Sequence, residues 1–300
     1  MGVVFPPVLL KSIYEKLFKV YRRFRLPDKN PYEVLKADVL DVIEESPTIK
    51  SFYLKPESPF EFATGQFIEL SLPGIGEAPF TPSSSHYEKE KIWVTIMNAG
   101  FVTNEIHKVQ KGDVMGIRGP YGKGYPLDKF NGKDVLLLGG GVGLAPLRCL
   151  LQTMIHDAKD YKSITVCFGA RTPADMIYQD QIDDWKSVDG VRHLCTVDKC
   201  PDGDKWNGKT GVVTVLLDDI TIDLKDAIAV VCGPPIMMKF GTFSLLDKGF
   251  KPENIYLSME KKMYCGFGQC RHCVIGKYYA CKDGPVFTYE QIKDEEKIWD

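Results

Sequence analysis

Four cysteines lie close together near the C-terminal end of this 300-residue chain. They are Cys265, Cys270, Cys273 and Cys281, a C-x4-C-x2-C-x7-C pattern. Such thiols could form disulfides, bind zinc, bind an iron–sulfur cluster or react as nucleophiles. C-x4-C-x2-C followed by a later cysteine is the plant-type [2Fe–2S] spacing, whereas structural zinc usually takes two C-x2-C-like pairs. An iron–sulfur cluster is therefore the leading interpretation, and zinc is the main alternative.

The composition of the chain helps to decide among these roles for the cysteines. Nine cysteines is an odd number, and the N-terminus has neither the basic region nor the cleavage site of a secretory signal. This argues against a disulfide framework and favours metal or redox use in a cytoplasmic protein. The formal net charge of -2 gives no basic field for nucleic acid. No stretch approaches the roughly 20 apolar residues that span a bilayer.

A second chemical motif is the glycine-rich stretch LLLGGGVGLAP. It follows an apolar run and opens a predicted helix, so its backbone amides and the helix N-terminus could receive a phosphate. Its glycines exceed what packing a helix on a strand needs, which favours a dinucleotide over a simple tight turn. The expected binding residues are Gly139, Gly140, Gly141, Val142 and Gly143.

Two further strand ends bear on the same nucleotide. The next predicted strand ends in CFGAR, with Arg171 where an acidic residue usually binds the NAD ribose. Arg171 could meet an adenosine phosphate or lie in solvent, so NAD and NADP both stay open. A later strand ends in VVCGPPIMM, and ligands of open α/β sheets bind beyond the carboxyl ends of strands. This predicts Cys232, Gly233 and Pro234 near the nicotinamide, although a rigid turn explains the prolines equally well.

Two kinds of scaffold must position these motifs. Residues 31–127 hold short, partly alternating segments between Pro, Gly and Ser, which indicates an antiparallel barrel. Residues 128–257 alternate strands with helices, which indicates a doubly wound parallel sheet, and residues 258–300 form the cysteine-rich segment. Strands are expected at KDVLLLGG, SITVCFGAR, VRHLCTVD, AIAVVCGPP and NIYLSME, and helices at ADMIYQDQIDDWKS and PIMMKFGTFSLLDKG.

Residues 1–30 stand apart as a predicted basic amphipathic helix. PVLLKSIYEKLFKVYRRFRL repeats its apolar residues at helical spacing and carries six Lys or Arg against one Glu. The plainer interpretation is a helix that packs on its own domain with a solvated basic face. The sharper one is docking on a partner subunit, or peripheral contact with an anionic membrane through residues 8–25.

A β-rich domain followed by GGGVGLAP and a late CGPP resembles the ferredoxin–NADP reductase family. The resemblance implies a flavin on the barrel and a nicotinamide dinucleotide on the second domain. The family's Arg-x-Tyr-Ser flavin motif matches APFTPSSS, where Ala78 replaces the arginine and removes a phosphate contact. Phe80 can still stack on the isoalloxazine and Thr81 can bond near flavin N5, with Ser83 as a further contact. FAD is expected, and FMN stays open.

Two more stretches match the family. NAGFVTNEI resembles the turn whose amides receive the flavin pyrophosphate, with Gly100, Val102 and Thr103 at the matching positions. A strand-to-helix turn with Thr103 as the cap would look the same. Cys232 matches a cysteine that lies beside nicotinamide C4 in the family, although a small buried residue is equally expected. Thr81 and Cys232 are thus the predicted catalytic residues.

The string MYCGFGQCRHCVIGKYYACKDGPVF narrows the resemblance to a subgroup with a C-terminal [2Fe–2S] segment. That subgroup includes gamma subunits of sulfhydrogenases and cytoplasmic hydrogenases, the flavin subunit of anaerobic sulfite reductase and small subunits of bifurcating transhydrogenases. The electron-transfer subunit of dihydroorotate dehydrogenase has the same DGPVF ending. Membership implies an oxidoreductase subunit that binds FAD, a [2Fe–2S] cluster and NAD(H) or NADP(H).

The three cofactors imply an order of electron flow. A nicotinamide gives a hydride, a cluster takes one electron at a time, and a flavin does both, so the flavin belongs between them. The sequence shows no complete site for a terminal substrate, so a larger redox subunit must be the partner. One alternative is the electron-transfer subunit of dihydroorotate dehydrogenase. A non-enzyme alternative is a zinc-stabilised nucleotide-binding module.

Overall fold

The computed structural model describes residues 30–299. One compact unit begins at Val34 and holds all the predicted site residues. The predicted basic helix of residues 1–30 lies outside the described residues, except for residue 30. The same holds for its predicted contact with a partner subunit or a membrane. Between residues 30 and 299, no helix has the length and apolarity needed to cross a membrane.

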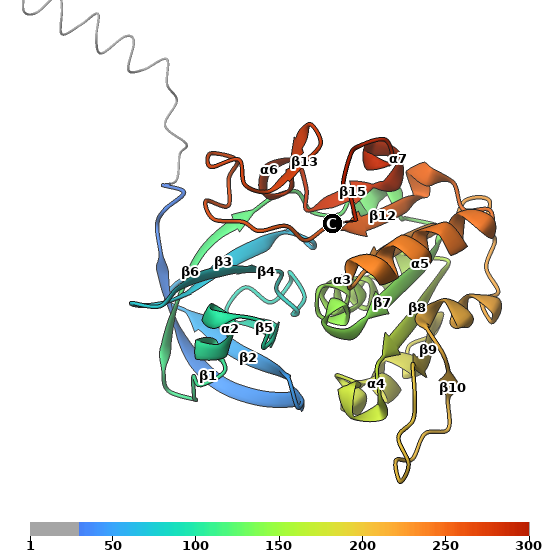
Figure 1. Ribbon diagram of the computed structural model, residues 1–300, viewed down its shortest axis with the longest axis horizontal. Coiled ribbons are helices and arrows are strands. Elements are labelled where there is room, and N and C mark those ends of the chain that lie inside the picture. The colour runs from blue at the N-terminus through green and yellow to red at the C-terminus, as the bar shows by residue number, and fades with distance from the viewer. Residues whose placement is uncertain (1–29, 300) are drawn as a thin grey trace, which may run out of the picture. The chain divides into compact units, whose positions relative to one another are not determined.

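The β-rich half forms a six-stranded antiparallel sheet in the order β4-β3-β6-β1-β2-β5 (Figure 1). The predicted antiparallel flavin-type domain is thus confirmed, with β4 and β5 at the ends of the sheet order. Its core contains Phe52, Leu54, Ile68 and Leu70, all fully buried. The strands are β1 (Leu35–Ser46), β2 (Ile49–Pro56), β3 (Phe67–Leu72), β4 (Gly76–Phe80), β5 (Ile92–Met97) and β6 (Val114–Tyr121), and the short helix α2 (Phe101–Ile106) follows β5.

The second half forms a seven-stranded sheet in the order β10-β9-β8-β7-β11-β12-β15. All neighbours run parallel except β15, which is antiparallel to β12. The chain winds outward from β7 in both directions, so the strand order reverses between β7 and β11, where open α/β sheets bind ligands. The strands are β7 (Asp134–Gly140), β8 (Ser163–Ala170), β9 (Val191–Val197), β10 (Lys209–Thr210), β11 (Ile228–Cys232), β12 (Ile255–Ser258) and β15 (Val286–Thr288).

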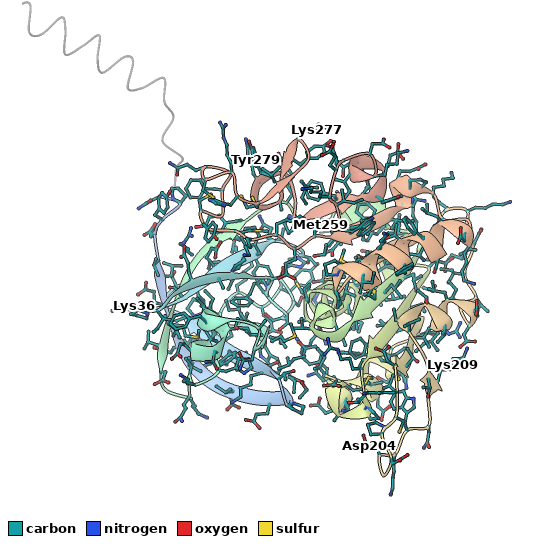
Figure 2. The ribbon with its side chains drawn as sticks, in the orientation of Figure 1. Lys36, Asp204, Lys209, Met259, Lys277 and Tyr279 are labelled. Atoms are coloured by element: carbon teal, nitrogen blue, oxygen red, sulfur yellow. The ribbon has the colours of Figure 1, made fainter. Side chains whose placement is uncertain are left out.

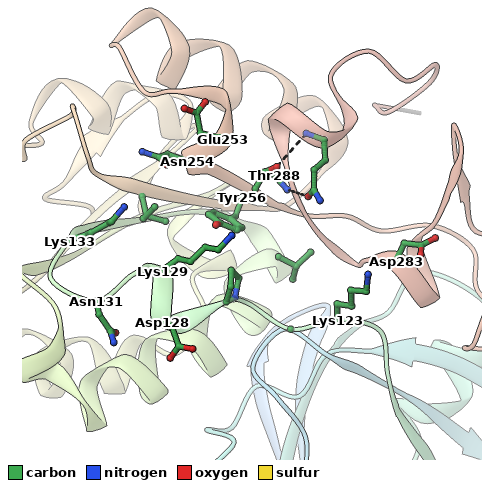
Figure 3. Close-up of a pocket in the computed structure, with 15 residues that line it drawn as sticks. Lys123, Asp128, Lys129, Asn131, Lys133, Glu253, Asn254, Tyr256, Asp283 and Thr288 are labelled. Atoms are coloured by element: carbon green, nitrogen blue, oxygen red, sulfur yellow. Dashed lines mark hydrogen bonds between the residues drawn. The ribbon is translucent and has the colours of Figure 1, made fainter.

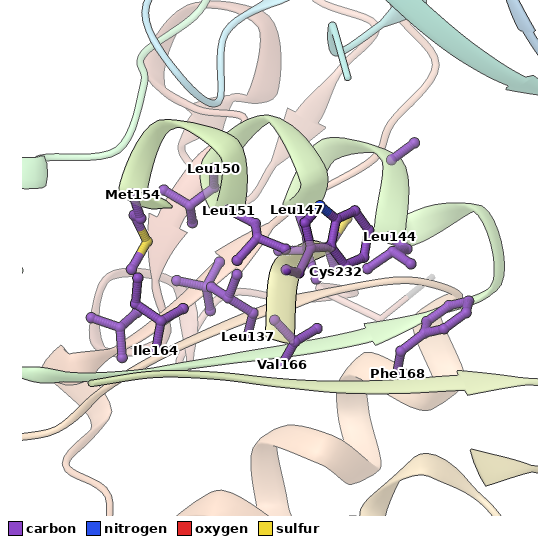
Figure 4. Close-up of a cluster of buried hydrophobic side chains, with 14 of the residues drawn as sticks. Leu137, Leu144, Leu147, Leu150, Leu151, Met154, Ile164, Val166, Phe168 and Cys232 are labelled. Carbon is purple, nitrogen blue, oxygen red and sulfur yellow. The ribbon is translucent and has the colours of Figure 1, made fainter. Parts of the chain in front are cut away.

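Helix α3 (Leu144–His156) packs on the large sheet through its apolar face. Leu144, Leu147, Leu151 and Met154 recur at helical spacing and are essentially inaccessible to solvent. Figure 4 shows them above β7 and β8, against residues such as Val166. Each such side chain contributes about 1.5–3 kcal/mol by burial, so the glycine turn that precedes α3 is held firmly.

One predicted helix was wrong over half its length. In ADMIYQDQIDDWKS only α4 (Ile182–Ser187) is helical, after two short 3-10 turns. Tyr178 interrupts the pattern with a φ of 57° and a buried ring. Its hydroxyl lies 2.6 Å from Thr95 Oγ1 and its backbone N–H donates to Glu45 at 3.0 Å. Contacts to the other sheet therefore override helix propensity, whereas α5 (Pro235–Asp247) forms as predicted.

The cysteine-rich segment is built onto the second sheet. Cys265, Cys273 and Cys281 belong to the same apolar cluster as Leu257 of β12. Figure 2 places Lys277 and Tyr279 on this segment and Met259 near its start. A parallel bridge between Lys123 and Pro285 adds a second attachment. Its elements are β13 (Val274–Ile275), β14 (Tyr278–Tyr279), α6 (Ala280–Asp283), β15 and α7 (Tyr289–Ile292).

Strand β9 carries a histidine that should make the fold acid-sensitive. His193 is 6% exposed and neither ring nitrogen has a hydrogen-bond partner. Burial lowers its pKa from 6.5 to about 4, and Lys186 adds to the effect. As pH falls through this window the unfolded chain takes up the proton first, so stability declines by up to about 1.4 kcal/mol per pH unit.

We therefore expect His193→Leu to flatten the pH dependence of stability between about pH 6.5 and 4. Urea unfolding of both proteins at pH 7 and pH 5 measures this. His272→Leu, which changes an exposed histidine, is the matched control. If the parent and His193→Leu lose the same unfolding free energy between pH 7 and pH 5, His193 is not the source of the acid sensitivity.

Candidate functional site

The glycine turn joins β7 to α3 at the carboxyl edge of the sheet. A Cβ on Gly143 would lie 2.4 Å from the carbonyl oxygen of Cys232, and one on Gly139 would lie 2.9 Å from Leu147 Cδ1. A Cβ on Gly140 would meet Met237 at 3.1 Å. Packing against backbone atoms therefore requires glycine at position 143, whereas positions 139 and 140 meet only the ends of flexible side chains, so packing accounts for part of the glycine string.

Gly141 differs from its neighbours in the turn. Its φ is +54° and no atom lies within 4 Å of its Cβ position. The backbone of Gly141 therefore faces open space at the start of α3, whereas half-buried Val142 beside it packs on the apolar core. This is the position in the turn where a phosphate can approach the main chain closely.

The CGPP turn lies directly against the glycine turn, through Gly143 and Cys232. The thiol of Cys232 is buried, which raises its pKa to about 12, so it is a neutral group near physiological pH. Gly233 has a φ of +158°, and a Cβ there would lie too close to Met237 Cε. Pro234 is exposed and precedes α5. The structure thus brings together two turns that are some 90 residues apart in sequence.

Arg171 follows β8 and is exposed. Its carbonyl oxygen accepts a hydrogen bond from the backbone of Lys199, at the end of the neighbouring strand β9, at 3.1 Å. Within residues 30–299 its guanidinium makes no ion pair. The geometry therefore leaves it available to a nucleotide and does not choose between NAD and NADP.

The flavin stretch begins on β4, a strand that sequence reasoning missed because Gly, Ala and Pro are rare in strands. Phe80 ends β4 opposite Ile68 of β3 and is half-buried, as is Thr81. Ser83 is fully buried: its N–H donates to Trp93 at 2.7 Å and its Oγ lies 3.0 Å from Thr95 Oγ1. The polar groups of Ser83 are therefore occupied by the protein itself.

Arg148 of α3 ties the nucleotide half to the flavin stretch, and sequence reasoning missed it. Its Nη1 donates to the carbonyl oxygen of Ser83 at 2.7 Å. The guanidinium carbon lies 4.8 Å from the ring centre of Trp93 and 5.2 Å from that of Tyr178. The side chain of Arg148 is 8% exposed. It therefore anchors the helix that follows the glycine turn to the flavin stretch, at a residue that closely follows Phe80 and Thr81 in sequence.

The start of α2 lies against β4. A Cβ on Gly76 of β4 would meet Val102 Cγ2 at 3.4 Å. Thr103 Oγ1 accepts the backbone N–H groups of Ala99 and Gly100, at 2.9 and 2.8 Å, and donates to the Gly100 carbonyl at 3.0 Å. Thr103 therefore rigidifies the turn, and the two flavin elements predicted separately are neighbours.

The cysteine loop directs backbone amides at sulfur. Cys265 Sγ accepts from Gln269 N at 3.2 Å and Cys270 N at 3.4 Å, and Cys281 Sγ accepts from Gly268 N at 3.0 Å. Gly268 adopts a φ of +85°, which side chains rarely allow. Such amides stabilise thiolate charge, so the donor set fits an iron–sulfur cluster.

The thiols differ in burial and acidity. Cys265, Cys273 and Cys281 are buried, whereas Cys270 is exposed. Burial opposes ionisation of Cys265, but backbone amides including that of Cys270 outweigh it and lower its pKa to about 7. Cys273 Sγ and Cys281 Sγ lie 3.1 Å apart. In residues 30–299 no three His, Cys, Asp or Glu side chains gather as a single-ion site would require.

A cavity of about 700 Å³ lies away from the glycine turn and is lined in part by Asp283, Val286 and Thr288 of the cysteine-rich segment (Figure 3). It is lined by residues at the amino ends of β7, β11 and β12, such as Lys133 and Tyr256, together with Lys129, Asp128 and Glu253. The glycine turn is at the opposite, carboxyl end of β7. The cavity mixes acids with lysines and is not the nucleotide site.

Comparisons with known proteins agree with this geometry. Residues 36–125 match the oxidoreductase FAD-binding domain and residues 137–242 the oxidoreductase NAD-binding domain. Residues 260–293 match the iron–sulfur cluster binding domain of dihydroorotate dehydrogenase B. Fold and site together define a flavin- and nicotinamide-dependent reductase with an added iron–sulfur domain.

Curated relatives cover nearly the whole chain. Sulfhydrogenase 1 subunit gamma of Pyrococcus furiosus is 34% identical over 90% of this chain and 96% of its own length. Sulfhydrogenase 2 subunit gamma of the same organism is 36% identical, over 87% and 96%. A probable dihydroorotate dehydrogenase B electron transfer subunit of Methanocaldococcus jannaschii is 32% identical, over 85% and 90%.

A solved structure is also similar. An NADH-dependent reduced ferredoxin-NADP oxidoreductase, studied for flavin-based electron bifurcation, superposes with a TM-score of 0.71 at 28% identity, over 85% of this chain and 89% of that one. The chain belongs to the ferredoxin–NADP reductase family, in the subgroup with a C-terminal iron–sulfur segment.

The comparisons confirm several predictions from the sequence. The chain is an NAD(P)H-dependent oxidoreductase of the electron-transfer-subunit type, with FAD, NAD(P) and iron–sulfur binding domains. The family match also favours an iron–sulfur cluster over the zinc alternative. The domain boundaries and the roles of individual residues stay predictions.

Proposed function

We propose that this chain is a cytoplasmic subunit that carries electrons between NAD(P)(H) and a larger redox subunit, using FAD and a [2Fe–2S] cluster. The observation that carries the proposal is that all three predicted sites lie in one compact unit and are joined by buried arginines. Arg148 links α3 to the carbonyl of Ser83, and Arg118 links β6 to the carbonyl of Cys265. FAD supplies the exchange between hydride and single electrons.

The residues of the two nucleotide sites act by position. With FAD bound, Phe80 would offer an aromatic face to the flavin ring, and Thr81 would offer a hydroxyl to its N5 side. The α2 turn, rigidified by Thr103, receives the flavin pyrophosphate. Gly141 admits the nicotinamide dinucleotide phosphates to the main chain. With the dinucleotide bound, the buried neutral thiol of Cys232 would contact the nicotinamide and help to orient it, without acting as a nucleophile.

The cysteine segment provides the outlet toward the partner. Cys265, Cys270, Cys273 and Cys281 are the cluster ligands, and Cys270 alone among them is exposed. The rim at Cys270 is therefore where a one-electron partner can approach within transfer distance. The gamma-subunit relatives support a multi-subunit setting.

Anaerobic purification and an anaerobic titration test this function. We expect bound FAD, identified after acid extraction, and iron and sulfide in equal amounts. NADH or NADPH should bleach the flavin absorption and then produce the electron paramagnetic resonance (EPR) signal of a reduced cluster. A colourless or zinc-containing protein would refute the proposal.

A second candidate is the electron-transfer subunit of a dihydroorotate dehydrogenase. The match of residues 260–293 to that protein's cluster domain favours it. In that case the native complex should contain a dihydroorotate-oxidising subunit. Affinity purification of the native complex, followed by mass spectrometry and by assays with dihydroorotate and with hydrogen, separates the two.

A further inference from the structure

Arg118 of β6 lies where the flavin sheet meets the cysteine loop, and its side chain is 4% exposed. Its Nη1 donates to the carbonyl oxygen of Cys265 at 2.8 Å, and its Nη2 donates to that of Tyr264 at 2.8 Å. The same guanidinium holds Glu77 of β4, with Nε 2.7 Å from Oε2 and Nη2 2.5 Å from Oε1. One buried cation therefore joins the flavin strand to the first cysteine of the cluster motif.

The surroundings of Arg118 fix its position. Tyr121 Oη accepts from Nη1 at 2.8 Å, and the Tyr121 ring lies against Gly266, where a Cβ would be 2.8 Å from the ring. Glu69 of β3 stands opposite Arg118 in the sheet register and is fully buried. Burial raises the pKa of Glu69 to about 8, so this carboxyl adds little negative charge at neutral pH.

The Arg118–Glu77 pair has a defined orientation. Two nitrogens of Arg118 donate to carbonyls of the cysteine loop, whereas the Glu77 carboxylate accepts from Arg118 Nε and Nη2, so Arg118 is the member of the pair that contacts the loop. The positive end of the pair thus faces the loop. Reduction of a cluster adds one negative charge, and a buried cation stabilises that charge much more than one in water would.

We propose that Arg118 is a positioning residue that holds the cysteine loop on β4 and β6 and raises the reduction potential of the cluster. The inference rests on the proposed function, because Arg118 has this role only if Cys265 is a cluster ligand. It predicts opposite effects for the two members of the pair. Loss of the Arg118 charge lowers the potential, and loss of the Glu77 charge raises it.

A redox titration of the purified protein tests this, with dithionite, mediators and EPR detection of the reduced cluster. In Arg118→Gln we expect the ratio of reduced to oxidised cluster, at the parent's midpoint, to fall about tenfold or more, equivalent to about 59 mV. Arg118→Lys keeps the positive charge, so its ratio of reduced to oxidised cluster should fall less. Glu77→Gln should shift the ratio upward, and Arg192→Gln, which changes an exposed arginine of β9, should leave it unchanged.

Several results would overturn the proposal. Ratios within threefold of the parent in both Arg118→Gln and Glu77→Gln would do so, as would shifts in the same direction. So would loss of the cluster in both Arg118→Gln and Arg118→Lys with FAD retained, which would leave Arg118 a purely structural role. If Arg118→Gln alone fails to assemble, the double variant Glu77→Gln/Arg118→Gln, which leaves no unpaired charge, is titrated against Glu77→Gln and should show the same fall.

The outcome is separable from that of the proposed function. Dithionite reduces the cluster without a nicotinamide, so the potential is measured whether or not NADH or NADPH is a substrate. A parent protein with no iron and sulfide would refute the proposed function. An intact parent cluster with an unshifted potential in the variants would refute only the role of Arg118.

Discussion

Cys270→Ala is expected to empty the iron–sulfur site while NADH or NADPH still reduces the flavin. The side chain of Cys270 is exposed, so its loss leaves no cavity in the core and the fold should persist. The remaining three cysteines are buried and cannot complete a four-thiolate set. Transfer to a one-electron acceptor should fall about 100-fold or more, because even second-shell changes at metal sites cost 10–100-fold.

Iron and sulfide analysis, the EPR signal after dithionite and the rate of flavin bleaching measure these effects. Cys200→Ala is the matched control, because Cys200 is also exposed and lies outside the cluster motif. An intact cluster in Cys270→Ala would remove this residue from the ligand set. Loss of flavin reduction together with the cluster would mean that the order of electron flow is wrong.

Gly143→Ala should unfold or severely weaken the nucleotide half of the chain. Its Cβ would lie 2.4 Å from the carbonyl oxygen of Cys232 and 2.6 Å from Gly233 Cα, both backbone atoms. No flexible side chain can move aside, so the two turns must separate. We expect a loss of about 3 kcal/mol or more, at the upper end for overpacked sites, together with loss of nicotinamide binding. Denaturant unfolding and the KM for NADH and NADPH measure both.

Gly141→Ala is the control within the same turn. Nothing lies within 4 Å of its Cβ position, so the substitution should cost only the strain of a left-handed residue, about 1–2 kcal/mol. The fold should persist, while KM rises because the methyl group enters the space of the phosphates. Equal destabilisation by the two substitutions would contradict the packing argument. An unchanged KM in Gly141→Ala would remove Gly141 from the binding site.

The parts of the site that could be predicted are those encoded by local spacing. The cysteine motif, the glycine turn and the alternation of strands with helices each depend on residues near one another in sequence, and the comparisons bear out the fold and cofactor classes they indicate. β4 could not be predicted, because the residues of GEAPF have a poor intrinsic strand propensity. The segment forms a strand because it pairs with β3, which is a tertiary contact.

The residues that join the sites could not be predicted. Arg118 lies in a stretch whose partners come from residues 77, 121 and 264–265, and Arg148 reaches back to Ser83. An arginine on a strand or helix looks like a surface residue until the fold brings acceptors to it. Tyr178 escaped prediction for the same reason, since its partners Glu45 and Thr95 lie on the first sheet.

Strand β15 has a consequence for how this protein can be dissected. The pairing of Val286–Thr288 with β12 seals the border of the large sheet from within the iron–sulfur segment. A chain truncated at Ser258 would present the open hydrogen-bonding groups of β12 to other molecules, a template for aggregation. The iron–sulfur segment therefore cannot be deleted without exposing an edge of the large sheet. A cluster-free protein should be made by replacing the cysteines rather than by truncating the chain.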